Sequence, residues 1–234
     1  MTPPHAHPHI APTNWHTCFL VMVQSATDER LARVLIESLR AARPGARFLE
    51  LVHRLDRDTS GLLLVAKNDA AHRALSRQFA GRQVGKTYLA LVWGRPDPPQ
   101  GRIEAPLGRH PAVRTRMAVR SAGGREAVTD YRTLETLGPF SFLEIRILTG
   151  RTHQIRVHMR HLGHPVAGDG RYGGSGFRKV RSPGFREVLE SFDRLALHAS
   201  VLEFRHPASG AAMRFHAPLP DDFARMLARL REAR

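Results

Sequence analysis

Short apolar runs bounded by turn residues are the feature that most restricts how this 234-residue chain can fold. Runs of this length and composition predict strands, whereas apolar residues spaced three and four apart predict helices. Strands are predicted at residues 48–52, 62–66, 86–94, 131–137, 141–148, 195–204 and 212–217, with two more between 102 and 128. Helices are predicted at residues 28–42, 70–80, 151–162 and 221–234. Because the two kinds of segment do not alternate regularly, we expect an α+β fold with a mixed, mostly antiparallel sheet and flanking helices and loops.

The first 14 residues differ in composition from the rest of the chain. Residues 1–14 are rich in Pro and His without periodicity, which predicts a disordered tail, and residues 15–234 are expected to form one domain. No apolar run approaches the roughly 20 residues that a membrane-spanning helix needs. Cys18 is the only cysteine, so no internal disulfide can form. These features predict a cytoplasmic protein that makes no contact with a membrane.

The charge of the chain indicates the kind of partner. Lys and Arg number 36 and Asp and Glu number 21, which leaves a formal net charge of +15 and a pI near 11.4. Such an excess favours a polyanionic partner, and nucleic acid is the first candidate. A basic residue composition without that function is the alternative.

A polar stretch between two apolar runs contains the first candidate for chemistry. Asp56 lies in residues 53–61 between Arg54 and Arg57, and a turn at residues 58–61 follows it. Nearby cations favour an ionised carboxylate, as a nucleophile or general base requires. The residues alone also fit a salt-bridged surface turn.

Other patterns suggest weaker alternatives. Asp56 and Asp58 could be the carboxylate pair of a carbohydrate hydrolase, since residues two apart on a strand lie roughly 6.5–7 Å apart. The histidines between 153 and 164 lack the spacing and companions of a metal site, so no metal is expected. Residues 168–184 form a basic, glycine-rich loop without the lysine of a phosphate-binding loop. Its cations are expected to contact RNA phosphates or solvent; they are Arg171, Arg178, Lys179 and Arg181.

Four blocks, in order and together spanning roughly residues 45–218, resemble one family. They are HRLDRDTSGLLLVAKN from residue 53, KTYLA from residue 86, GRTHQIRVH from residue 150, and RLALHA from residue 194 followed by His206-Pro207. The chain is similar in these blocks to the RluA-type pseudouridine synthases. The resemblance implies that family's catalytic domain, RNA as partner, isomerase activity and no cofactor.

The resemblance also implies roles for individual residues. Asp56 would be the catalytic carboxylate, Arg151 would pair with it, and Tyr88 would stack on the target base. Arg54 would fill the gap left by a flipped base, and Ile155 and Leu197 would be apolar walls of the base pocket. The residues expected to contact RNA are Arg54, Arg57, Lys86, His153, Gln154, Arg156 and Arg171. Whether Asp56 acts as nucleophile or as base stays open.

The N-terminal part departs from the family pattern. Gln24-Ser25-Ala26 stands where the family has Asn-Lys-Pro after a strand, for which residues 19–23 are the candidate. No S4-type RNA-binding domain is expected in the residues before His53. The segment leading into the Asp56 block resembles the branch that modifies large-subunit (23S) ribosomal RNA. Transfer RNA is the alternative substrate, a catalytically inactive RNA-binding paralogue is the alternative function, and a monomer is expected.

Overall fold

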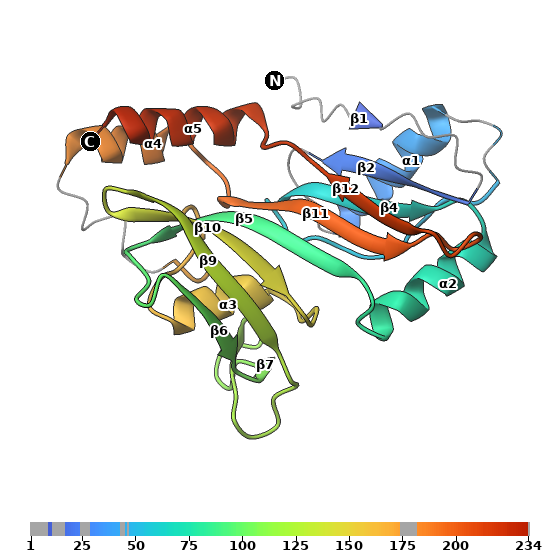
Figure 1. Ribbon diagram of the computed structural model, residues 1–234, viewed down its shortest axis with the longest axis horizontal. Helices are drawn as coiled ribbons and strands as arrows, with labels where there is room; N and C mark the ends of the chain where they lie inside the picture. Colours follow the sequence, from blue (N-terminus) through green and yellow to red (C-terminus); the bar gives the residue numbers. More distant parts are fainter. Residues whose placement is uncertain are drawn as a thin grey trace. The chain divides into compact units, whose positions relative to one another are not determined.

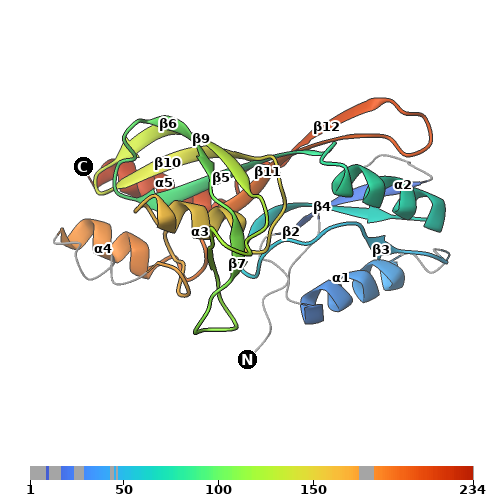
Figure 2. The same cartoon turned by 90° about the horizontal axis from the view of Figure 1, so that it is seen from below.

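The computed structural model describes residues 9–10, 17–23, 29–42, 45, 47–173 and 182–233 (Figures 1 and 2). Its strands and helices confirm the predicted α+β class. The chain packs as two compact units. Unit 1 comprises Met1–Lys86 and Ala199–Pro218, and unit 2 comprises Thr87–His198 and Leu219–Arg234. The sequence did not predict this division, and the single domain expected over residues 15–234 stays a prediction.

Unit 1 is organised around one fully buried strand, β4 (Ser60–Ala66). The antiparallel strands β2 (Cys18–Val23) and β3 (Glu50–Leu51) pair with it, and α2 (Asp69–Ala80) packs against it. The hairpin of β11 (Leu197–Arg205) and β12 (Ala212–His216) contributes Leu202 and Phe204 to the same core. The remaining elements of this unit are β1 (His9–Ile10) and α1 (Glu29–Ala42). Burial of every β4 side chain explains why its sequence is a continuous apolar run rather than an alternating one.

The N-terminal segment differs in part from its prediction. His9 and Ile10, in the expected disordered tail, form β1 and pair antiparallel with Met22 and Val21 of β2. Backbone hydrogen bonding to an existing strand edge orders these two residues. Strand β2 confirms the strand expected at 19–23. The rest of the tail and the 24–26 segment lie outside the described residues.

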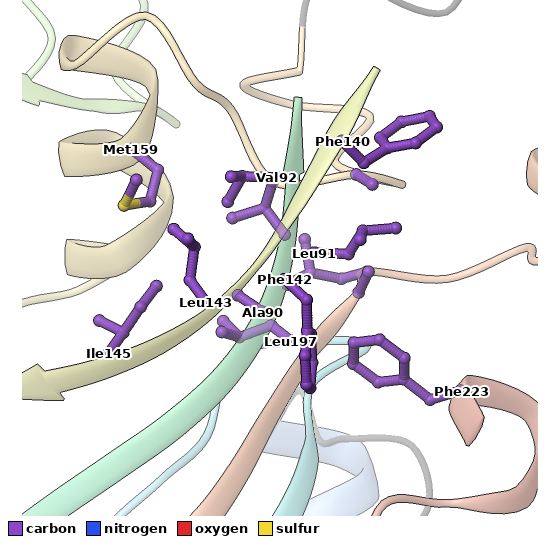
Figure 3. Close-up of a cluster of buried hydrophobic side chains, with 14 of the residues drawn as sticks. Ala90, Leu91, Val92, Phe140, Phe142, Leu143, Ile145, Met159, Leu197 and Phe223 are labelled. Carbon is purple, nitrogen blue, oxygen red and sulfur yellow. The ribbon is translucent and has the colours of Figure 1, made fainter. Parts of the chain in front are cut away.

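Unit 2 contains four antiparallel strands in the order β5, β10, β9 and β6, whose bounds are Gly85–Trp93, Phe140–Ile147, Val128–Leu137 and Gln100–Glu104. Helix α3 (Gln154–His161) lies on one face of the β5–β10 pair, and α5 (Asp221–Glu232) lies on the other. Figure 3 shows Met159 of α3 and Phe223 of α5 on opposite sides of these strands. The ring of Phe142 lies 6.3 Å from that of Phe223. Covered on both faces, β10 is buried along most of its length.

Two helical predictions in unit 2 need correction. The helix predicted over 151–162 begins only at Gln154, because His153 adopts a left-handed φ of 55° that cannot continue an α-helix. Helix α4 (Pro183–Glu190) was not predicted. Its signals are Pro at the first turn and the buried Phe185, Val188 and Leu189 at helical spacing.

A second, two-stranded sheet joins β7 (Leu107–Arg109) and β8 (Met117–Val119) within the arginine-rich segment. It confirms strands between 102 and 128. Among the described residues, no helix combines the length and apolar composition that crossing a bilayer requires.

Candidate active site

Asp56 lies in a loop between β3 and β4, at the start of the buried strand. The carbonyl of Asp56 accepts a hydrogen bond of 3.1 Å from the N–H of Thr59. Leu55 beside it is buried, whereas Asp56 itself is partly exposed. Asp58 has a left-handed φ of 64° and lies 3.7 Å from the guanidinium of Arg57. A closed turn therefore presents the carboxylate from the edge of a rigid element.

His53 ties the beginning of this loop to the core of unit 1. Its Nε2 atom accepts a hydrogen bond of 3.2 Å from the backbone N–H of Leu64, and its ring stacks on Phe79 at 4.8 Å. Burial, and then the positive charge of Lys86, lower the pKa of His53 from 6.5 to about 4. The ring is therefore neutral at pH 7, as an acceptor at Nε2 must be.

Gly61 ties the end of the loop to β11. Its φ of 123° favours glycine, and a Cβ at this position would overlap the backbone of Ala199. The absence of a side chain allows two backbones to approach closely at the base of the Asp56 loop. His53 and Gly61 together leave the loop little freedom to move.

Arg151 lies in a turn that precedes α3 in unit 2. Its backbone N–H donates to the Oε1 of Gln154 at 3.0 Å, and its Nε donates to the carbonyl of Glu126 at 2.9 Å. Gln154 is buried and also bonds Thr149 at 2.7 Å and the Val128 carbonyl at 2.9 Å. The turn is therefore anchored to the adjoining ends of β9 and β10.

Tyr88 and the two predicted pocket walls lie at the core of unit 2. Tyr88 is on β5, opposite Ile145 of β10, and packs partly buried against the main cluster. Ile155 and Leu197 are buried members of that cluster. Their contribution to the core is clear from this packing, while contact with a base stays a prediction.

The residues expected to contact RNA fall into two groups. Arg54 and Arg57 are exposed, Arg171 is exposed, and Lys86 and His153 are partly buried. Two others serve the interior of unit 2 instead: Gln154 makes the bonds above, and Arg156 is a buried partner of Asp169. The structure shows their polar groups bonding within the protein, and contact with RNA stays a prediction for both. Arg178, Lys179 and Arg181 lie outside the described residues.

The histidines of α3 and its flanks bind separate partners. His158 is fully buried between Thr129 and the Ala105 carbonyl, each at 2.9 Å, and burial lowers its pKa. His164 contacts the carbonyl of Trp93 at 2.8 Å. The described part of the chain contains no cluster of His, Cys, Asp and Glu that could hold a metal ion.

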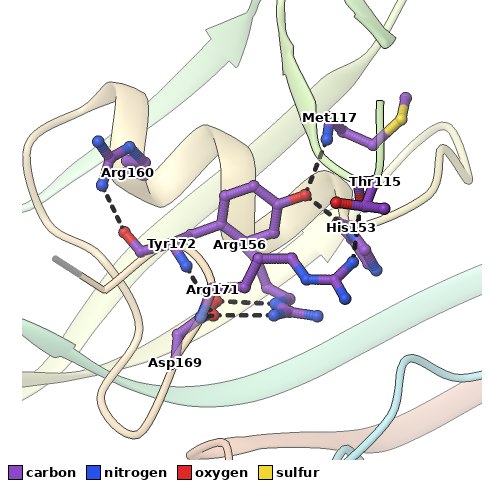
Figure 4. A network of polar contacts seen from close by, with 8 residues as sticks. All are labelled: Thr115, Met117, His153, Arg156, Arg160, Asp169, Arg171 and Tyr172. Atoms are coloured by element: carbon purple, nitrogen blue, oxygen red, sulfur yellow. Dashed lines mark hydrogen bonds and ion pairs between the residues drawn. The ribbon is translucent and has the colours of Figure 1, made fainter. Parts of the chain in front are cut away.

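Sequence reasoning missed the polar cluster around Asp169 and Tyr172. Asp169 forms a bidentate ion pair with Arg156 at 2.7 and 2.8 Å. The Tyr172 hydroxyl lies 2.7 Å from Nδ1 of His153 (Figure 4). The signal in the sequence is an Asp and a Tyr within the glycine-rich segment.

The predicted catalytic residues belong to different units. Asp56 is in unit 1, and Tyr88 and Arg151 are in unit 2. The predicted pairing of Asp56 with Arg151 therefore stays a prediction.

Comparison with known proteins identifies the family. The profile of the RNA pseudouridylate synthases matches residues 21–161, more than half of the chain, including Asp56, Tyr88 and Arg151. An uncharacterized RNA pseudouridine synthase of Chlorobaculum parvum is 47% identical over 196 residues, covering 81% of this chain and 58% of the relative. Ribosomal large subunit pseudouridine synthase D of Vibrio cholerae is 46% identical over 183 residues, covering 78% of this chain and 56% of the relative.

The chain thus spans little more than half the length of these curated relatives. A solved structure, human RNA pseudouridylate synthase domain containing 1, superposes with a TM-score of 0.74 at 30% identity and covers 99% of this chain and 98% of its own. Profile and structure agree with the four sequence blocks and with the fold. The chain belongs to the RNA pseudouridylate synthase family.

Proposed function

We propose that this protein isomerises uridine to pseudouridine in RNA and that Asp56 is its essential carboxylate. The observation that carries the proposal is the Asp56 loop. A partly exposed carboxylate is held between the His53 and Gly61 anchors, inside the segment that matches the family profile. Such restraint is what an attacking group needs, because small displacements of a reacting atom lower the rate strongly.

The reaction requires little beyond positioning and one ionised group. The bond between the ribose C1′ and the uracil N1 breaks, the uracil rotates, and a bond from C1′ to C5 forms. C5 then loses its proton and N1 gains one, so the net reaction consumes no oxidant, reductant or group donor. In this proposal Asp56 acts as the nucleophile or the general base. Arg151 stabilises the negative charge of Asp56, and Tyr88 stacks on the uracil ring. A uridine in folded RNA must be flipped out to be reached, and stacking on an aromatic ring contributes about 1–3 kcal/mol per base.

Large-subunit ribosomal RNA is the proposed substrate. Relatives from Vibrio cholerae, Pseudomonas aeruginosa and Escherichia coli carry the name ribosomal large subunit pseudouridine synthase. The net charge of +15 suits a polyanion, and binding should weaken steeply with salt. Action in the cytoplasm and as a monomer belongs to the same proposal.

The test is incubation of the purified chain with unmodified large-subunit ribosomal RNA, followed by chemical mapping of pseudouridine. Asp56→Asn should lower the single-turnover rate by about a thousandfold or more, since the charge that the reaction uses is removed. RNA affinity should stay within about twofold, because Asp56 is an anion and makes no attractive contact with phosphate.

Asp58→Asn is the matched control, because Asn tolerates the left-handed conformation at this position. It should leave the rate near that of the wild type. A comparable loss in both variants would show that the loop, rather than the Asp56 carboxylate, had been damaged. An active Asp56→Asn enzyme would rule out the proposed role. Activity on transfer RNA alone would correct the substrate while keeping the reaction.

A further inference from the structure

The hydroxyl of Tyr172 joins two separate segments of unit 2 (Figure 4). It accepts a hydrogen bond of 2.9 Å from the backbone N–H of Met117 in β8. It also lies 2.7 Å from Nδ1 of His153, the residue before α3. Burial raises the pKa of Tyr172, so the phenol keeps its hydrogen at neutral pH. The Met117 N–H can only donate, so the Tyr172 oxygen is its acceptor, while the tautomer of His153 decides which group donates in the second hydrogen bond.

Tyr172 itself is held on several sides. Its backbone N–H donates to Asp169 at 2.9 Å, and its carbonyl accepts from Arg160 at 2.7 Å. The guanidinium of Arg156 lies 5.0 Å from the centre of its ring and is fixed by the buried pair with Asp169. Only 3% of Tyr172 is exposed, so its hydroxyl has one well-defined position.

His153 is the residue that needs such a partner. Its left-handed φ of 55° is unfavourable for a side chain with a Cβ and persists only where the surroundings hold it. Gln154, the next residue, accepts a hydrogen bond from the backbone N–H of Arg151 through its side-chain Oε1. The turn before α3 is therefore restrained at two residues: the Tyr172 hydroxyl bonds His153, and the Gln154 side chain bonds Arg151, two residues earlier.

We propose that Tyr172 is a positioning residue for the reaction: through its hydrogen bond to His153 it fixes the turn that carries Arg151. This inference rests on the proposed function, since it takes Arg151 to act on the reacting carboxylate. Tyr172 acts through His153 and has no direct contact with the substrate in this scheme. The glycine-rich segment thereby contributes to catalysis through its tyrosine.

The test compares Tyr172→Phe with Tyr131→Phe. Both changes delete one hydroxyl from a buried tyrosine, but the Tyr131 hydroxyl donates to the Pro98 carbonyl at 3.2 Å rather than to a residue of the Arg151 turn. Tyr172→Phe should lower the single-turnover rate at saturating enzyme by about tenfold, the scale of a small displacement of a catalytic group. RNA affinity should change by less than about twofold, because no phosphate contact is removed. Tyr131→Phe should change neither quantity.

Variants of His153 separate positioning from general stability. His153→Asn keeps an acceptor near the Nδ1 position and tolerates the left-handed conformation, so it should retain most of the rate. His153→Ala should lose about as much as Tyr172→Phe, and the double variant should lose no more than either, as expected for one shared interaction. Additive losses, or a Tyr172→Phe effect confined to affinity or thermal stability, would overturn the inference.

Amide hydrogen exchange gives a readout that does not depend on activity. Exchange in a peptide covering residues 150–158 should accelerate in Tyr172→Phe and stay unchanged in Tyr131→Phe. Unchanged exchange in both variants would refute the anchoring of the Arg151 turn, whatever the activity. A wild-type protein that forms no pseudouridine, with exchange altered as expected, would instead refute the proposed function and leave the anchoring in place.

Discussion

The Asp56 loop of unit 1 and the Arg151 turn of unit 2 are restrained by opposite means. The Asp56 loop depends on close backbone approach at Gly61 and on a neutral, stacked His53. The Arg151 turn depends on a dense set of hydrogen bonds from Gln154 and Glu126, and His153 beside it adjoins a buried ion pair through Tyr172. Both regions carry a residue predicted to be catalytic.

The contrast has a physical reason. The neutral ring of His53 and the glycine at position 61 restrain the loop through stacking and close backbone contact, without adding a charge at those two positions. A guanidinium is ionised at any physiological pH, so polar groups packed around the Arg151 turn do not change the charge of Arg151. The two regions should therefore respond differently to added volume, lost charge and acid.

The largest effect is expected from Gly61→Ala. The added Cβ would overlap the Ala199 backbone, and φ would be unfavourable, so we expect a loss of about 5 kcal/mol in unfolding free energy from the two penalties together. Gly210→Ala is the control: its φ is 72°, but a Cβ there meets no atom within 4 Å. That change should cost only about 1–2 kcal/mol. Urea unfolding measures both, and equal losses would mean that conformation alone, and not the close approach, makes Gly61 necessary.

Asp169→Asn should cause the second-largest loss of unfolding free energy. It leaves the Arg156 guanidinium buried without a charged partner, which costs about 3–5 kcal/mol in comparable pairs. The control is Glu144→Gln, which breaks the exposed pair with Arg132 and should cost less than about 1 kcal/mol. Thermal unfolding of the two variants provides the comparison. Similar small losses would show that the Tyr172 cluster is held by packing rather than by its ion pair.

Acid should produce the smallest effect and should distinguish the regions. Because the folded-state pKa of His53 is lowered from 6.5 to about 4, its contribution to stability is present above pH 6.5 and is lost as pH falls toward about 4. Burial raises the pKa of Asp169, but Arg156 and two backbone N–H groups lower it below 3.8 overall. Its contribution is therefore present above pH 3.8 and persists at pH 5.

The measurement is urea unfolding of the wild type and of His53→Leu at pH 7.5 and pH 5.0. The free energy of unfolding of the wild type should exceed that of His53→Leu by more at pH 7.5 than at pH 5.0. For Asp169→Asn the gap to the wild type should be the same at both pH values. A His53 gap that stays constant would mean that the ring is not kept neutral by the fold.

Much of the architecture follows from local sequence signals. Strand β4 and helix α2 come from a continuous apolar run and from the Asn68 cap, whose side chain accepts from Ala71 N–H at 2.8 Å. The polar stretch between two apolar runs predicted that Asp56 lies on a loop beside the strand that is β4, as the structure shows. These features depend on neighbours in the chain, which a sequence displays directly.

The errors lie where distant residues decide the outcome. The start of α3 was misplaced because His153 is held left-handed by its surroundings, among them Tyr172 from another segment. The buried pair of Arg156 with Asp169 was not predicted, because the two residues lie 13 apart in the sequence and meet only through the fold. Partners that meet through tertiary packing leave no local pattern to read.

Unit 1 is built from two separate segments of the chain, which has a consequence for protein synthesis. Its core includes Leu202 and Phe204, and its Asp56 loop packs through Gly61 on Ala199. A ribosome releases these late residues only after all of Thr87–His198. The nascent chain therefore carries an Asp56 loop that cannot reach its final conformation until residues 199–204 have been synthesised. Closing such a long segment is slow compared with local folding, so the loop should be among the last parts of the molecule to form.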